Sequence, residues 1–273
     1  MSAKLRNILL ELLGISLSGL VIIPSFIVLI NSFKGEGEAS DMSLALPKVW
    51  RIIENYSEVF KVGRIPTAFI NSVIITGSSV LLIILFCSTS AFIIQRRKNG
   101  FTRTLQVLLL AGMTLPLSVI VTYILLYNLH LTTTFLAIIL LYTATSYPVI
   151  TFLYIGFYNS VSREIDESAI IDGTKGFGLF FKVIFPLLKP INATALVLSF
   201  VTVWNDFGIA IYFLNQASKY TLGLTVFFFA GEKSSQWNYI FADLIIISLP
   251  VVLVYVFAQR YIVSGLTAGA VKS

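Results

Sequence analysis

Charged side chains are scarce in this 273-residue chain, where Asp, Glu, Lys and Arg together make up only 12% of the residues. Ordinary soluble domains carry about 25%, because most charged side chains lie in water and cover the surface. Hydrophobic residues make up 57% of the chain, so too little charge is left to cover a soluble fold. The composition therefore argues against a soluble enzyme and indicates a polytopic membrane protein.

Cysteine and histidine are also nearly absent. The single cysteine, Cys87, excludes a disulfide framework and a cysteine-rich metal site. No P-loop, His-Glu-x-x-His or Gly-x-Ser-x-Gly motif occurs in the sequence. We therefore expect no catalytic, metal or cofactor site in this chain. The chain is not expected to be an enzyme, and any ATP hydrolysis must come from another polypeptide.

Long apolar runs are what the sequence does contain. Each of six runs reaches the roughly 20 residues that a helix needs to cross a membrane. The predicted spans are residues 8–30, 68–94, 105–127, 135–158, 191–213 and 239–262. The sequence thus predicts an all-α protein with six transmembrane helices. The first run resembles a signal peptide in following Lys4 and Arg6, but its length and Glu11 favour a retained helix.

The basic residues give the predicted topology. With six spans, both termini lie on one side of the membrane, and that side carries twelve basic and four acidic residues. The other side carries seven basic and six acidic residues. Cytoplasmic loops are enriched in Lys and Arg, so both termini are expected in the cytoplasm. The net charge of +6 then reflects topology and not nucleic-acid binding.

Two regions organise the chain. Residues 1–67 are expected to form an N-terminal transmembrane helix and a long outer loop, with a short helix near residues 48–60. Residues 68–273 are expected to form a five-helix core. The longest inner connection, at about residues 159–190, contains all four acidic residues of the inner side.

This inner connection has the pattern of a helix, a glycine and a second helix. Ser160 and Ser162 suit an N-cap, and the acids that follow suit the first turn of a helix. Gly173 suits the C-terminal end, and Pro186 marks the return to the membrane. Such an elbow suits docking to another protein. An amphipathic loop lying among lipid headgroups is an equally good interpretation of the pattern.

The same connection resembles the EAA loop of permease subunits in binding-protein-dependent ABC importers. That pattern is Glu-Ala-Ala, three residues, Gly, nine residues, then Ile-x-Leu-Pro. This chain has Glu167-Ser168-Ala169, then Gly173, then Val183 to Pro186 at the same spacings, with mild departures at 168, 183 and 185. Three segments, namely 164–173, 204–207 and the tail 265–272, resemble the carbohydrate branch, specifically the maltose-type second permease subunit. The resemblance runs from about residue 71 to the C-terminus.

The resemblance implies a type I ABC importer permease fold in the bacterial cytoplasmic (inner) membrane, and import of a sugar, in particular an oligosaccharide, by alternating access. It assigns Glu167, Ser168, Ala169 and Gly173 to ATPase coupling, with Pro186 shaping the return. The implied partners are a second homologous permease, two cytoplasmic ATPase subunits that bind ATP and Mg²⁺, and an extracytoplasmic sugar-binding protein. The chain also contacts membrane lipid, and no nucleic acid is expected.

Polar residues within the spans have two interpretations. Trp204, Asn205 and Asp206 could line the sugar pathway, since an aromatic ring, an amide and a carboxylate suit a sugar. Pairing of Asp206 with a helix end or a partner subunit is the favoured alternative, and Asp243 is expected at a helix start or interface. A stand-alone ion-coupled transporter using Glu11, Asp206 or Asp243 is the alternative function.

Overall fold

The computed structural model describes residues 3–231 and 235–270 of the chain, and these ranges contain helices and irregular segments but no strand. The α-helices are α1 Ala3–Asn31, α2 Glu36–Ser40, α3 Ile52–Val62, α4 Ile65–Arg96, α5 Gly100–Thr114, α6 Val119–Asn128, α7 Phe135–Tyr158, α8 Glu164–Ile171, α9 Phe185–Leu187, α10 Lys189–Trp204, α11 Gly208–Phe213 and α12 Trp237–Ala270. The π-helix η1 covers Leu179–Ile184, and the 3₁₀-helices η2 and η3 cover Ala217–Lys219 and Leu222–Phe228.

The number of membrane-spanning elements agrees with the sequence. Four helices in the described ranges are individually long and apolar enough to cross a membrane, namely Leu10–Asn31, Ile65–Arg96, Phe135–Tyr158 and Trp237–Phe257. Two further helix pairs pass the same test if each bent pair counts as one span, which gives up to six. The prediction of an all-α polytopic membrane protein is confirmed.

The third predicted span, 105–127, is broken into two helices. Its helices α5 and α6 meet at an angle of 119°, and Pro116 lies in the connection between them. Proline disfavours helical backbone at the preceding residue and removes a hydrogen-bond donor. Leu115 accordingly has extended backbone angles and ends α5. The apolar run continues across this break, which is why hydropathy alone indicates one straight helix.

The fifth predicted span, 191–213, also differs from the structure. Helix α10 ends at Trp204, and α11 begins separately at Gly208. On the other side, the segment Leu179–Leu187 joins α10 at a bend of 78°. The helical segment Leu179–Leu187 therefore leads into α10, whereas the sequence pattern assigns it wholly to the inner loop.

The first compact unit comprises Met1–Phe69 and Leu224–Pro250. Its outer loop is ordered by buried polar groups. The Asn55 side chain donates to the carbonyls of Ser32 and Lys34, each at 2.8 Å, and accepts from Asn238 at 2.9 Å. The Lys34 ammonium donates to the Asn31 side chain at 2.9 Å. Helix α3 confirms the short helix expected in this loop.

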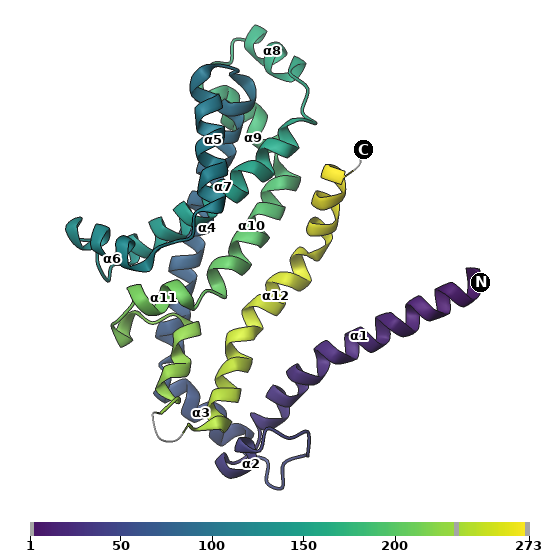
Figure 1. The fold of residues 1–273 in the computed structure, drawn as a ribbon, viewed down its shortest axis with the longest axis vertical. Coiled ribbons are helices and arrows are strands. Elements are labelled where there is room, and N and C mark those ends of the chain that lie inside the picture. Colours follow the sequence, from purple (N-terminus) through teal and green to yellow (C-terminus); the bar gives the residue numbers. More distant parts are fainter. Residues whose placement is uncertain (1–2, 232–234, 271–273) are drawn as a thin grey trace. The chain divides into compact units, whose positions relative to one another are not determined.

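The second compact unit comprises Ile70–Gly223 and Val251–Ser273. Within it, α7 packs against both α5 and α10. The α5–α7 approach is close, because a Cβ atom at Gly112 would lie 3.1 Å from Pro148 Cγ. Helix α8 lies beyond the start of α5 and packs against η1 (Figure 1). Helix α8, and with it the inner connection, therefore lies at one end of this unit. The predicted division of the chain into residues 1–67 and a five-helix core of residues 68–273 stays a prediction.

Candidate functional site: the helical elbow and the polar faces of the bundle

Helix α8 begins where the sequence places its start. The Ser162 hydroxyl accepts the Glu164 backbone N–H at 3.2 Å, which satisfies one of the donors that every helix N-terminus leaves open. Ser160 instead donates to the Phe157 carbonyl at 2.7 Å. Three acidic residues lie in the first turn of α8, where the helix dipole stabilises negative charge.

The end of α8 depends on Gly173. This residue has φ +87°, a left-handed conformation that only glycine adopts at little energetic cost. The Thr174 N–H donates to the Ala169 carbonyl at 2.9 Å, and the Gly173 N–H donates to the Ile170 carbonyl at 3.0 Å. These two bonds form a Schellman motif. The predicted glycine stop is confirmed.

The residues of the predicted coupling motif divide between two faces of α8. Glu167 and Ser168 are exposed, whereas Ala169 is buried, as is Asp166 one turn earlier. The buried face packs against η1. Ala169 therefore contributes close packing within this chain, and Glu167 is the member whose charged group is free to meet another molecule. The coupling role of all these residues stays a prediction.

The return segment is held by aromatic packing. Phe180 packs edge-on against Phe181 with 4.9 Å between ring centroids, and against Phe92 of α4 at 5.5 Å. Phe177, in contrast, is exposed. Pro186 occupies the first turn of α9, where its missing N–H breaks no helical bond. The segment is thus anchored on α4, and the largely exposed Phe177 ring stacks on Phe181 with 6.5 Å between ring centroids.

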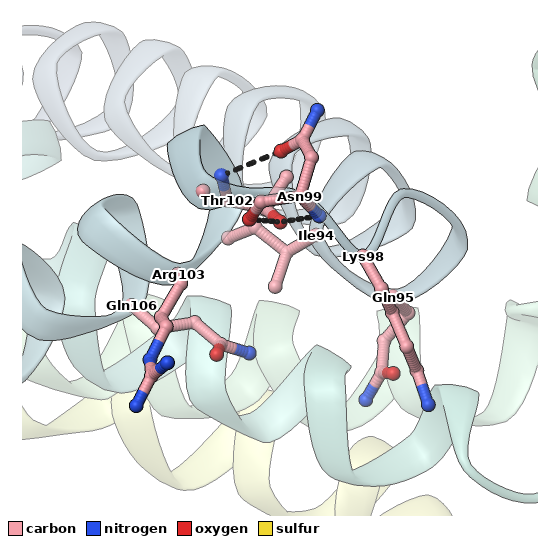
Figure 2. A pocket seen from close by; sticks show the side chains of 8 residues that line it. Ile94, Gln95, Lys98, Asn99, Thr102, Arg103 and Gln106 are labelled. Carbon is pink, nitrogen blue, oxygen red and sulfur yellow. Dashed lines mark hydrogen bonds between the residues drawn. The ribbon is translucent and has the colours of Figure 1, made fainter.

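Basic and amide side chains surround the turn from α4 to α5. They line a groove of about 480 Å³, which Figure 2 shows, and include Gln95, Lys98, Asn99, Arg103 and Gln106. The turn itself is rigid, because Asn99 Oδ1 accepts the Thr102 N–H at 2.9 Å and Thr102 Oγ1 accepts the Asn99 N–H at 3.2 Å. This reciprocal capping box fixes the start of α5.

The structure does not bring Trp204, Asn205 and Asp206 together around one cavity. Trp204 is buried and stacks on Phe200, with ring centroids 5.2 Å apart, and it lines an apolar groove beside α4. Asn205 is exposed at the end of α10. Asp206 lies in the break between α10 and α11. The three neighbours in sequence therefore point to different surroundings.

Asp206 acts as the cap of α11. Its Oδ2 accepts the backbone N–H groups of Ile209 and Ala210 at 2.9 and 3.1 Å. The Tyr142 hydroxyl of α7 donates to the same oxygen at 2.8 Å. A carboxylate with three donors on one oxygen satisfies a helix end and ties it to α7. This geometry supports the favoured pairing with a helix end, and a role in sugar contact stays a prediction.

A groove between α7 and α10 is a feature that the sequence did not reveal. It measures about 470 Å³ and is lined by four hydroxyl side chains, those of Thr145, Ser146, Ser199 and Thr202, among apolar residues. Ser199 is only 1% exposed, and its hydroxyl has no hydrogen-bond partner within the described part of the chain. The three-residue spacing of Ser199 and Thr202 is the one sequence pattern that places two of these hydroxyls on the same helix face.

Asp243 differs from its expected position. It lies within α12 and is fully buried, not at a helix start or interface. Thr225 Oγ1 lies 3.0 and 2.8 Å from its two carboxylate oxygens. The segment containing η3 covers this carboxyl, which no local pattern could show. Among the described residues, no group of three or more His, Cys, Asp and Glu side chains is placed to hold a metal ion.

Comparison with known proteins identifies the class. Residues 88–268 match the family described as the binding-protein-dependent transport system inner membrane component. The chain belongs to this family and is a permease subunit of an ABC importer. It is a multi-pass protein of the inner membrane. Membership implies a partner permease, an ATPase and a binding protein. It confirms the importer interpretation of the sequence over the ion-coupled carrier.

Individual relatives match over nearly their whole length. The chain is 34% identical to the probable starch degradation products transport system permease protein AmyC of Thermoanaerobacterium thermosulfurigenes, over 98% of this chain and 97% of that protein. It is 33% identical to the melibiose/raffinose/stachyose import permease protein MelC of Bacillus subtilis, over 92% and 91%.

A solved structure shows the same fold. The crystal structure is that of a bacterial ABC transporter involved in the import of the acidic polysaccharide alginate. Its matching chain superposes with a TM-score of 0.81, covers 96% of this chain and 98% of that chain, and is 19% identical. The type I ABC importer permease fold expected from the sequence is confirmed.

Proposed function

We propose that this chain is one of two permease subunits of an ATP-driven oligosaccharide importer. A second, homologous permease completes the translocation pathway, and two cytoplasmic ATPase subunits bind ATP and Mg²⁺. An extracytoplasmic binding protein delivers the sugar. The family membership supports the importer, and the relatives named for starch products and for melibiose, raffinose and stachyose support an oligosaccharide substrate.

The observation that carries the proposal is the geometry of the elbow. An eight-residue helix ends at a left-handed glycine, with exposed Glu167 on the helix and exposed Phe177 after the turn. A charged anchor beside apolar surface suits a cleft in another protein. We assign Glu167, Ser168 and Gly173 to the contact itself. Ala169 holds the buried face of α8, and Pro186 shapes the return to α10.

The elbow and both termini lie on the cytoplasmic side in this proposal. The support is the excess of Lys and Arg in the loops on that side, which is the usual sign of cytoplasmic loops. ATP binding then closes the ATPase pair and displaces α8 of each permease. The helices of the pair turn as rigid bodies between inward-open and outward-open arrangements.

The sugar pathway follows the groove lined by hydroxyls between α7 and α10. Its polar groups are neutral, which suits a neutral sugar that offers hydroxyls and C–H surface. The Ser199 hydroxyl beside this groove is buried, and it has no hydrogen-bond partner among the described residues. Asp206 fixes the outer end of the pathway by capping α11, and Trp204 and Asn205 flank that break.

The test is reconstitution of the complete complex in vesicles with its binding protein. Sugar uptake is expected to require ATP on the side of the vesicle membrane that corresponds to the cytoplasm. Uptake is also expected to stop when this chain is omitted. Vesicles that hold this chain alone are the control and are expected to show no flux. Robust flux by the lone chain in an ion gradient would contradict the proposal.

A further inference from the structure

A buried ion pair joins the elbow to the long helix α4. Arg96, the last residue of α4, and Asp166 of α8 form an ion pair in which Arg96 Nη2 donates to Asp166 Oδ1 at 3.1 Å, and Arg96 Nε pairs with Oδ2. Their side chains are only 13% and 11% exposed. The pair is 70 residues apart in sequence, so it is a tertiary tether and not a feature of either helix.

The same guanidinium also holds the chain that leads into α8. Both Nη atoms of Arg96 donate to the Val161 carbonyl at 3.4 Å. The neighbouring Gln95 carbonyl accepts from Arg163 Nη2 at 2.9 Å. Two consecutive residues at the end of α4 therefore hold the approach to α8, its first turn and its carboxylate.

We call these contacts of Gln95 and Arg96 with α8 and its approach the α4–α8 joint. Gln95 also extends the joint to the end of α7. Its amide nitrogen donates to the Ile155 carbonyl and to the Asn159 side chain, each at 3.0 Å. The capping box of Asn99 and Thr102 orders the start of α5 at the same corner (Figure 2), and the Thr102 hydroxyl donates to the Arg97 carbonyl at 2.7 Å. The ends of α4, α7 and α8 thus meet through hydrogen bonds to Gln95 and Arg96, and α5 begins beside them.

The other acids of the elbow are not used in this way. Glu164, Glu167 and Asp172 are exposed, and no hydrogen bond or ion pair to their carboxylates occurs within the described residues. Only Asp166 is turned inward. A buried, hydrogen-bonded pair is geometrically specific, because breaking it leaves an uncompensated charge in a poorly solvated site.

We propose that Arg96 and Asp166 are positioning residues that make α8 and α4 move as one body. A push on α8 is then passed to a helix long enough to span the membrane, and is not absorbed by the connection 159–163. This inference rests on the proposed importer function. It assigns to Arg96 a role in coupling outside the Glu-Ser-Ala-to-Pro segment that the sequence singled out.

The test compares Arg96→Met with Arg97→Met in the reconstituted complex. Arg97 is the matched control, since it is the adjacent arginine and is exposed, with no side-chain partner among the described residues. The measured quantity is the number of sugar molecules imported per ATP hydrolysed. Arg96→Met and Asp166→Asn are expected to lower this ratio about tenfold while ATP hydrolysis continues. Arg97→Met is expected to match the wild type.

Two further variants separate coupling from folding. In the double variant Arg96→Met with Asp166→Asn, the loss is expected to equal that of one single change, because a pair acting as a unit is not additive. Arg96→Lys keeps the charge but loses the planar fork, and it is expected to fall between the wild type and Arg96→Met. If Arg96→Met fails to assemble, the import ratio of Arg96→Lys tests the role of the ion pair in its place.

The outcomes are distinct. A wild-type import ratio in Arg96→Lys and in Asp166→Asn would overturn the joint. Loss of ATP hydrolysis and import in equal proportion would also overturn it, since that would show a merely structural role. Failure of the wild-type complex to import any sugar with ATP would instead refute the proposed function and leave the joint without its premise.

Discussion

The left-handed turn at Gly173 gives a quantitative test of the elbow. A Cβ atom placed on Gly173 meets no atom within 4 Å, so Gly173→Ala has no steric contact with the rest of the chain. Its only penalty is the backbone conformation at φ +87°. A residue with a Cβ pays about 1–2 kcal/mol in that region. The penalty lowers the fraction of molecules that form the left-handed turn and leaves the membrane helices unchanged.

This penalty sets the expected effect. A free energy of about 1–2 kcal/mol corresponds to a factor of about 5 to 30. If the ATPase binds only the elbow that has this turn, Gly173→Ala weakens its affinity for the permease pair by up to that factor. Asn tolerates the left-handed region better than Ala, so Gly173→Asn should lose less. The assay is equilibrium binding of the labelled ATPase subunit to the permease pair in nanodiscs.

Gly156→Ala is the matched control for this experiment. Gly156 lies in α7, and a Cβ atom placed on it would also meet nothing within 4 Å, but its backbone is helical, where Ala is favoured over Gly. Its affinity should equal the wild type. Gly173→Trp adds bulk on the same exposed face and should abolish binding while insertion is retained. Wild-type affinity in Gly173→Ala, or equal losses with Ala and Asn, would refute the argument.

Four further changes test other parts of the structure. Glu167→Lys reverses the exposed charge on α8 and should uncouple ATP hydrolysis from uptake, as seen in the import ratio; normal uptake would contradict the coupling role. Asp206→Ala removes the cap of α11 and should cost about 1–2 kcal/mol, with Tyr142→Phe giving a smaller, non-additive loss. Thermal unfolding in detergent measures both, and an altered KM for sugar at unchanged stability would favour sugar contact instead. Thr134→Ala removes the bond to the Ala137 N–H at 3.1 Å and should lower stability by about 1 kcal/mol, whereas no change in the unfolding midpoint would show that the α7 cap is dispensable.

Local signals in the sequence predicted the elbow well. Gly173 ends α8 because a left-handed residue and two backbone bonds within six residues suffice to stop a helix. Ser162 and the acids after it likewise act on backbone groups only a few residues away. These interactions involve near neighbours, so sequence order already holds the information needed to predict them.

The breaks in the third and fifth spans were not predictable from hydropathy. Partition into the membrane depends on how apolar a segment is, and the runs around Pro116 and Asp206 stay apolar on both sides of each break. The direction of the helix changes because Pro116 lacks a donor and because the Asp206 carboxylate starts α11. Tyr142, the third donor to that carboxylate, comes from 64 residues away.

The distribution of charge in the elbow shows what the structure adds to the sequence. All four acids of the inner side fall within residues 164–172, and counted together they suggest one surface for a partner. The structure separates them, because Asp166 is neutralised by Arg96 inside the protein while Glu167 stays exposed. One acid fixes α8 to its own subunit, and its neighbour is free to meet another. A helix that transmits force needs an attachment on each side, and adjacent residues on α8 provide the two.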